Sequence, residues 1–309
     1  MKKYLITCFA LLMMSVLSVN AESVILALHH NGKVTLFNDS QFKAAHEAAE
    51  EGDTLYLSEG YFIGDIAISK RIYLIGGGKN TIIAGNVDLQ IEDAPEGYMF
   101  ENIYLKGTVK AVGHNVTGLR MRKVICDNLQ QDRGVNGDYI DCFFVNCFFK
   151  NIFLSRMRNV SLVNCKVAGL SDGAYSAGSI QFINCNISHW AGGHSATFIN
   201  SIVYGEWFEG LADHSVLAIH NLSYAQESTR QDCYEYNPEN IFDENMECII
   251  PQEAMSQYLG TDSTIVGCYG GETPFTLTPT TPRVLEKTVT LDKGKKTLKV
   301  DIKIGTDNE

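Results

Sequence analysis

One short pattern returns six times between residues 118 and 224, and it constrains the fold more than any other feature. The copies read LRMRKVIC, CFFVNCFF, VSLVNCKV, IQFINCNI, ATFINSIV and LAIHNLSY, each an alternating stretch around one polar pivot. A period of about 20 residues with strand-type alternation indicates stacked coils rather than a closed globule. The pivots, spaced 23, 18, 20, 16 and 21 residues apart, are Lys123, Asn146, Asn164, Asn184, Asn200 and Asn221.

Two columns of the aligned repeats are almost wholly apolar and are predicted to point into the coils, stacked about 4.8 Å apart. Asparagine at the pivot tolerates the left-handed backbone of a sharp corner, and stacked amides can also bond to one another along the axis. We therefore expect a structural role for the pivots. The column two residues before the pivot is Met121, Phe144, Leu162, Phe182, Phe198 and Ile219. The column three residues after it is Cys126, Phe149, Val167, Ile187, Val203 and Tyr224.

The position after the pivot holds three cysteines, Cys147, Cys165 and Cys185. Their spacing equals the coil period, and buried cysteine behaves as a small hydrophobe, so an interior stack is preferred to a zinc or redox site. No metal site is predicted. Cys233 and Cys248 differ because they lie in a polar stretch without the repeat. They are predicted to form a disulfide, with Cys268 as a competing partner.

Residues 1–21 have the features of a secretory signal peptide, with two lysines, an apolar run and a small residue at the cleavage position. The apolar run is short for a membrane span, so we expect a secreted protein without membrane insertion, in the periplasm, on the outer surface or outside the cell. Removing Lys2 and Lys3 changes the formal charge from −11 to −13, which argues against a nucleic-acid partner.

Residues 22–52 are predicted to cap the solenoid with a hairpin around Asn31-Gly32 and a helix over 41–51. The segments TLYL, IAI, IYLIG and TIIAG then follow as the strands of the first coils. With Gly52-Asp53-Thr54, Gly60-Tyr61 and Leu74-Ile75-Gly76, this opening resembles the right-handed parallel β-helix proteins of the pectin-lyase-like superfamily. The resemblance implies an all-β right-handed parallel β-helix, but it leaves the chemistry open because lyases, hydrolases and proteins without known activity share it.

Arginines near the start of the repeats are the candidates for catalysis. Arg120 and Arg122 alternate around Met121, Arg156 and Arg158 alternate around Met157, and Asp138 falls midway between them. If these residues share one outer face, they form either an exposed ion-pair ladder or a cationic groove for an acidic polysaccharide. In the groove an arginine or Lys123 would act as the base.

The resemblance also implies tests for an enzyme. Polyuronate lyases of this superfamily combine an arginine or lysine base with acidic calcium ligands, and the hydrolases use clustered aspartates and a histidine. Asp138 and Asp141 are the close acidic pair of the central repeats. No cofactor is predicted, and calcium would be needed only by a lyase.

Three aromatic residues are candidates for stacking against a sugar: Tyr204, Trp207 and Phe208. The sequence Asp213-His214-Ser215 invites comparison with a catalytic triad. Such groups must converge in space rather than follow one another, so we interpret the sequence as a turn.

The last third departs from the repeat. Residues 225–257 are acidic and are predicted to form a side loop of the β-helix domain, which would span 22–273. Residues 274–309 are predicted to contain a proline-rich linker and a β-hairpin with strands over 284–291 and 297–304.

The sequence therefore predicts an exported, non-catalytic β-helix protein of the cell envelope or extracellular space that binds glycan or another surface. The alternative is a polysaccharide lyase or glycoside hydrolase acting on an acidic polysaccharide. Nothing in the sequence indicates the oligomeric state.

Overall fold

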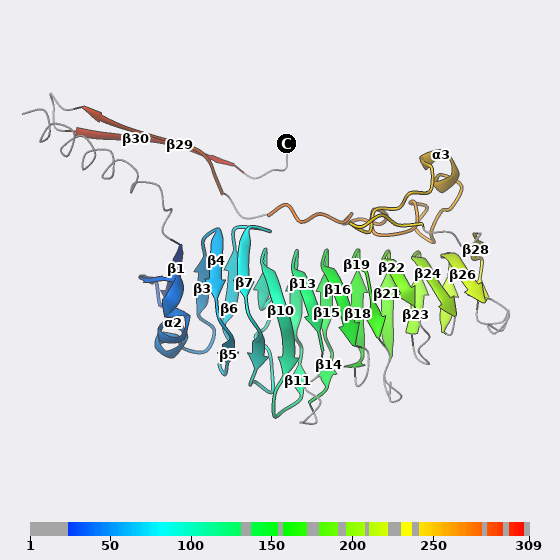
Figure 1. The fold of residues 1–309 in the computed structure, drawn as a ribbon, viewed down its shortest axis with the longest axis horizontal. Helices are drawn as coiled ribbons and strands as arrows, with labels where there is room; N and C mark the ends of the chain where they lie inside the picture. The colour runs from blue at the N-terminus through cyan, green and yellow to red at the C-terminus, as the bar shows by residue number, and fades with distance from the viewer. Residues whose placement is uncertain are drawn as a thin grey trace, which may run out of the picture.

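A computed structural model describes residues 24–130, 137–153, 157–171, 179–190, 196–207, 210–221, 230–236, 241–279, 283–292 and 297–305. Parallel strands from successive coils stack side by side along one axis (Figure 1). The predicted β-solenoid is therefore confirmed. The predicted signal peptide lies outside the described residues.

Within the described residues, a 12-stranded sheet runs the length of the solenoid. Two antiparallel strands open it, and every later pairing is parallel. In spatial order its strands are β2 (Lys33–Asn38), β1 (Ile25–His30), β3 (Thr54–Leu57), β6 (Tyr73–Gly76), β9 (Phe100–Glu101), β12 (Arg120–Arg122), β15 (Phe143–Val145), β18 (Val160–Val163), β21 (Ile180–Ile183), β23 (Ala196–Ile199), β25 (Leu211–Asp213) and β27 (Arg230–Gln231).

A 13-stranded sheet forms the second wall among the described residues, and a three-stranded sheet forms part of a third. The strands of the 13-stranded sheet are β4 (Gly60–Ile63), β5 (Ile66–Ile68), β7 (Thr81–Ala84), β8 (Val87–Leu89), β10 (Tyr104–Ala111), β13 (Ile125–Leu129), β16 (Phe148–Phe153), β19 (Lys166–Val167), β20 (Leu170–Ser171), β22 (Asn186–Trp190), β24 (Ile202–Trp207), β26 (Val216–Asn221) and β28 (Tyr234–Glu235). Those of the three-stranded sheet are β11 (Val116–Thr117), β14 (Tyr139–Ile140) and β17 (Met157–Arg158).

The N-terminal cap has the predicted hairpin and a shorter helix. Asn31 and Gly32 both have positive φ and make the turn. A 3₁₀ turn, η1 (Asp39–Gln41), leads into the helix α2 (Phe42–Ala48). The helical segment begins at Asn38, whose side chain forms a capping box with Gln41. It ends at Ala49, where the backbone becomes extended (ψ 153°), and not at residue 51 as predicted.

The two predicted inward columns are buried and in register for five coils. Phe144 pairs with Leu162, Leu162 with Phe182 and Phe182 with Phe198, and the last two rings stack with centroids 5.1 Å apart. Phe198 then pairs with Ala212. The alignment predicted for the sixth copy is therefore wrong, since Ala212 takes the place predicted for Ile219.

The corners explain this difference. From β9 onward, a left-handed residue marks the corner between the 12-stranded and 13-stranded sheets, and these residues are Asn102, Lys123, Asn146, Asn164, Asn184, Asn200, His214 and Asp232. The sixth pivot is therefore His214 and not Asn221, which is the last residue of β26. Asp232 marks a further coil that begins with β27, inside the stretch predicted to be an acidic side loop.

The residue after each corner forms a hydrogen-bonded column. The Cys147 amide donates to Cys165 Sγ (3.4 Å), and the Cys165 amide donates to Cys185 Sγ (3.4 Å). Ser201 and Ser215 continue the column with their hydroxyl groups. Cys147, Cys165 and Cys185 are all fully buried, and burial raises the pKa of the Cys147 and Cys185 thiols. These cysteines therefore form part of the core.

Residues 241–279, which we call the strap, run back along the corner column (Figure 1). The strap includes the short helix α3 (Gln252–Met255). Asn164 Nδ2 donates to the carbonyl groups of Cys268 (3.0 Å) and Gly270 (2.7 Å), and Asn200 Nδ2 donates to Thr261 Oγ1 (3.1 Å). The amides of Asn164 and Asn200 therefore bind the strap, whereas the sequence had also allowed stacked corner amides to bond to one another.

The predicted C-terminal hairpin is confirmed. Strands β29 (Arg283–Asp292) and β30 (Thr297–Gly305) pair antiparallel, with Val289 opposite Val300 and a bulge near Val284. In Figure 1 the hairpin extends away from the coils.

Candidate functional site

The candidate bases on β12 lie on the 12-stranded sheet. Arg120 is exposed. Arg122 pairs with Glu101, its Nη2 lying 2.6 Å from Oε1, and its guanidinium lies 4.4 Å from the centre of the Tyr98 ring. Arg122 is therefore already neutralised by a carboxylate on the neighbouring coil.

Lys123 is a corner residue under the strap. Its backbone is left-handed (φ 55°), its side chain is buried, and its Nζ donates to the Thr278 carbonyl (2.5 Å). Burial, with a smaller contribution from Arg122, lowers the pKa of the Lys123 ammonium. A lowered pKa suits a base, but the strap covers this one, and it holds residues 274–279 against the coils instead.

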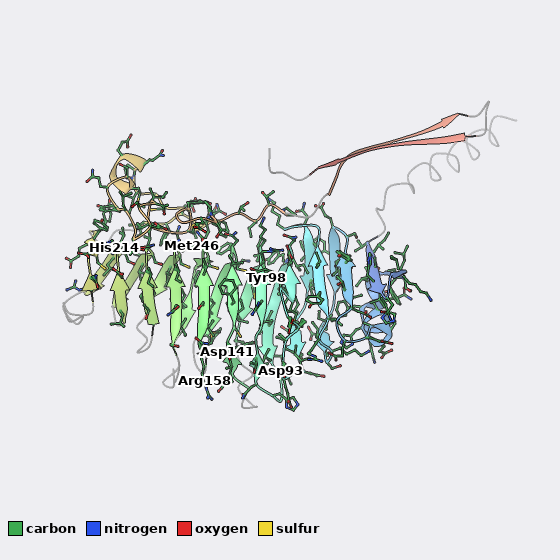
Figure 2. All side chains as sticks on the ribbon, turned by 180° about the vertical axis from the view of Figure 1, so that it is seen from behind. Asp93, Tyr98, Asp141, Arg158, His214 and Met246 are labelled. Atoms are coloured by element: carbon green, nitrogen blue, oxygen red, sulfur yellow. The ribbon has the colours of Figure 1, made fainter. Side chains whose placement is uncertain are left out.

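Arg158 lies on the three-stranded sheet and Asp138 immediately precedes its strand β14, so neither lies with Arg120 and Arg122. Arg158 pairs in register with Ile140, whereas Arg120 pairs with Phe143 of β15. In Figure 2 Arg158 lies at the edge of the solenoid away from the strap, whereas Tyr98 lies nearer to the strap. The structure thus splits the predicted charged stripe between two walls. Arg156 lies outside the described residues.

The Asp138–Arg158 pair is half-buried. Arg158 Nη2 donates to Asp138 Oδ2, the Asp138 carboxylate is almost fully buried, and its Oδ1 has no hydrogen-bond partner. The Asp138 amide donates to Asn115 Oδ1 (2.9 Å). Asn115 on the preceding coil thus holds the Asp138 backbone, and Arg158 on the following coil carries the charge that pairs with the Asp138 carboxylate.

An open hollow of about 430 Å³ adjoins this pair on the preceding coils. Asp93 forms a parallel bridge with Thr117, which continues the row through Ile140 to Arg158. His114 Nδ1 lies 3.6 Å from Glu92 Oε1. The surface, which we call the polar face, consists of Glu92, Asp93, His114, Asn115, Asp138 and Arg158. It presents hydrogen-bond donors and acceptors from successive coils.

The second acidic residue of the predicted pair, Asp141, lies at the next corner. Its backbone is left-handed (φ 54°), and its Oδ1 accepts a hydrogen bond from Asn159 Nδ2 (2.6 Å). Asp141 and Asp138 are therefore held by different partners.

Of the three predicted aromatic residues, the structure describes the side chain of Tyr204 alone. A second hydrophobic cluster lies between the solenoid and the strap and includes Ile202, Val216 and Phe242. Tyr204 packs against this cluster, and its ring meets His189 edge-to-face at 6.3 Å. Trp207 is the last residue of β24, and its backbone pairs with Asn221. Phe208 lies outside the described residues.

Cys233 and Cys248 are both free thiols, so the predicted disulfide is not formed. Cys233 follows the corner Asp232 and donates to the Gln231 carbonyl (3.3 Å), as Cys185 donates to Ile183. It therefore belongs to the repeat. Cys248 packs with the second hydrophobic cluster.

Three ligand-type side chains converge near the end of the solenoid, where no metal site was predicted. Ligand atoms of Asp213, His214 and Asp232 lie within 4.8 Å of one another. His214 is a corner, as the turn interpretation requires. The Ser215 hydroxyl is buried and donates to the Asp213 carbonyl (3.0 Å), which directs it away from a triad.

Comparison with known proteins adds no relative. No family model, no curated protein and no solved structure matches this chain. Among the described residues, no helix has the length and apolar character needed to cross a membrane.

Proposed function

We propose that this chain is an exported, non-catalytic parallel β-helix protein of the pectin-lyase-like superfamily type, and that it binds a neutral glycan along its polar face. The observation that carries the proposal is the engagement of three candidate bases, whereas Arg120 is exposed and Arg156 lies outside the described residues. Arg122 is paired with Glu101, Arg158 with Asp138, and Lys123 with the strap. A lyase needs a base that is free to reach a sugar proton, and these three groups have other partners.

The polar face suits sugar hydroxyl groups. Carboxylates at Glu92 and Asp93 accept hydrogen bonds, His114 and Asn115 can donate them, and the open hollow admits a chain from solvent. A linear glycan repeats its hydroxyl groups along its length, so side chains repeated from coil to coil can bind it at several points.

Charge favours a neutral ligand over a polyuronate. The chain carries a formal charge of −11, and three carboxylates lie on the polar face against one arginine. A polyanion would be repelled there unless a cation intervened. The chain's acidity therefore supports a neutral glycan.

Isothermal titration calorimetry against neutral and acidic polysaccharides tests the proposal. We expect saturable binding of a neutral polymer that weakens at least several-fold in Asp93→Asn and in His114→Ala. His29→Ala, which alters an exposed histidine on β1, should bind as the unaltered protein does. Binding that is indifferent to both polar-face variants contradicts the assignment.

An activity assay separates binding from catalysis. Acidic polysaccharides incubated with the protein, with and without calcium, should yield no unsaturated uronate by ultraviolet absorbance. Steady product formation would replace the binding function with that of a lyase.

A further inference from the structure

The last two corners of the solenoid depart from the asparagine pattern. His214 (φ 43°) and Asp232 (φ 47°) stand where the preceding coils have Asn184 and Asn200. Those asparagines lie under the strap, and Asn200 exchanges two hydrogen bonds with Thr261. Within the described residues, the side-chain partners of His214 are instead two carboxylates, those of Asp213 and Asp232.

The ligand-type atoms of these three side chains lie close together. Asp213 Oδ1 lies 2.5 Å from His214 Nδ1, and Asp232 Oδ2 lies 4.0 Å from His214 Nε2. A tetrahedral zinc ion with bonds of about 2.0–2.2 Å separates its ligand atoms by roughly 3.4 Å. Ligand atoms already within 4.8 Å of one another reach that spacing through small side-chain rotations.

The backbone that carries these ligands is fixed by strand pairing. Asp213 is in register with Gln231, and the His214 amide donates to the Gln231 carbonyl (3.0 Å). Two ligands therefore come from one coil and one from the next. Figure 2 places His214 in the terminal coils, on the edge of the solenoid that the strap follows.

The electrostatic environment favours a cation. The nearest arginine along the chain, Arg230, is engaged by Glu235. The side chains of Asp213 and His214 are 36% and 27% exposed, so an ion could enter from solvent and keep a water ligand.

We infer that Asp213, His214 and Asp232 bind one zinc ion that joins the last two coils. An imidazole with two carboxylates suits a borderline cation, whereas calcium prefers six to eight oxygen ligands. The ion would hold β27, a strand of two residues, against β25. This site is independent of the polar face and of glycan binding.

Titration of the chelator-treated mature protein with zinc chloride measures the site directly. We expect one zinc ion per chain, with affinity at least tenfold weaker in His214→Asn and in Asp232→Asn. Both substitutions restore the residue that earlier coils use at this left-handed position, so they should preserve the fold. His30→Asn is the matched control, because His30 also contacts two carboxylates but at the opposite end of the solenoid.

Hydrogen exchange supplies a second readout. In the unaltered protein, zinc should slow exchange of the His214 amide, which bonds to Gln231. In His214→Asn, which lacks the imidazole ligand, zinc should leave exchange at this position unchanged. The inference is overturned if zinc does not saturate, if His214→Asn binds as tightly as the unaltered protein, or if His30→Asn abolishes binding. Calcium binding of equal strength would also overturn it, because an imidazole ligand disfavours calcium.

Discussion

The strap is held by a buried cation, and the two partners of that cation should respond unequally to mutation. Lys166 lies on β19 with its side chain 3% exposed, and its Nζ is 2.5 Å from Glu247 Oε1. It also bonds to Tyr269 Oη (3.1 Å) and lies 4.6 Å from the centre of the Phe275 ring. The Glu247 side chain is 44% exposed, so only the lysine depends on the pair for its charge to be compensated.

The magnitudes follow from that asymmetry. Glu247→Ala leaves a buried ammonium without its counter-ion, which typically costs about 3 kcal/mol. Lys166→Met leaves a carboxylate that water and Tyr269 Oη can still solvate, and the methionine fits beside Phe275. We expect that change to cost about 1 kcal/mol or less. Removing Glu247, the more exposed partner, should therefore lower the free energy of unfolding more than removing Lys166.

Native-state hydrogen exchange at two strap amides measures both costs. The Gly267 amide donates to the Asn200 carbonyl (2.7 Å), and the Cys268 amide donates to Asn186 Oδ1 (3.0 Å). Their protection should fall about 100-fold in Glu247→Ala and at most about fivefold in Lys166→Met. Glu244→Ala, at an exposed neighbouring position, is the control. Equal losses in the two variants, or a larger loss in Lys166→Met, would refute the reasoning.

Three further predictions concern the core, the cap and the corners. Burial raises the pKa of the Cys142 thiol from 9.0 to about 12, so the unfolded state ionises first and stability is lost as the pH rises between these values. Urea titrations at several pH values should show that Cys142→Ala reduces this loss of stability by up to about 1.4 kcal/mol per pH unit. An unchanged dependence of the unfolding free energy on pH would count against Cys142 as the cause. Burial lowers the pKa of His46, whose Nε2 accepts the Ser69 amide hydrogen, so stability should fall as the pH drops below 6.5. In His46→Gln thermal melts should show a weaker acid dependence, and an equal dependence would exclude His46 as the cause. Asn164→Gly should cost about 2 kcal/mol through lost hydrogen bonds to the strap, and Asn164→Ala about 1 kcal/mol more at its left-handed backbone, both from urea titration. Equal costs would mean that the backbone strain is relieved elsewhere.

The solenoid was predictable because its evidence is local. Each coil carries its inward residues at fixed offsets from a corner, so five copies identify the columns from Met121 to Phe198. The sixth copy failed because asparagine is not the only residue that marks a corner. The left-handed conformation also admits histidine and aspartate, and His214 lies only 14 residues after Asn200.

The candidate site was less predictable because its contacts join residues that are far apart in the sequence. Arg122 and Arg158 occupy equivalent places in the sequence pattern, since each follows a methionine flanked by arginines. They nevertheless lie on different walls, because the coil turns at a second corner, marked by Asp141 and Asn159. The strap contacts are more remote still. Asn164 and Cys268 are 104 residues apart, and no repeat connects them.

The strap also restricts where a polymer can bind. It covers one edge of the solenoid and engages Lys123, Asn164 and Asn200 there, so that edge is closed to a glycan. The polar face lies toward the opposite edge, where Figure 2 shows Asp93, Asp141 and Arg158 together. The polar residues repeated at the corner between the 12-stranded and 13-stranded sheets look functional in the sequence. In the structure, Lys123, Asn164 and Asn200 at this corner bind the strap. On the far wall Asp138 is buried against Arg158, so the side chains left for the proposed ligand are those of Glu92, Asp93, His114 and Asn115.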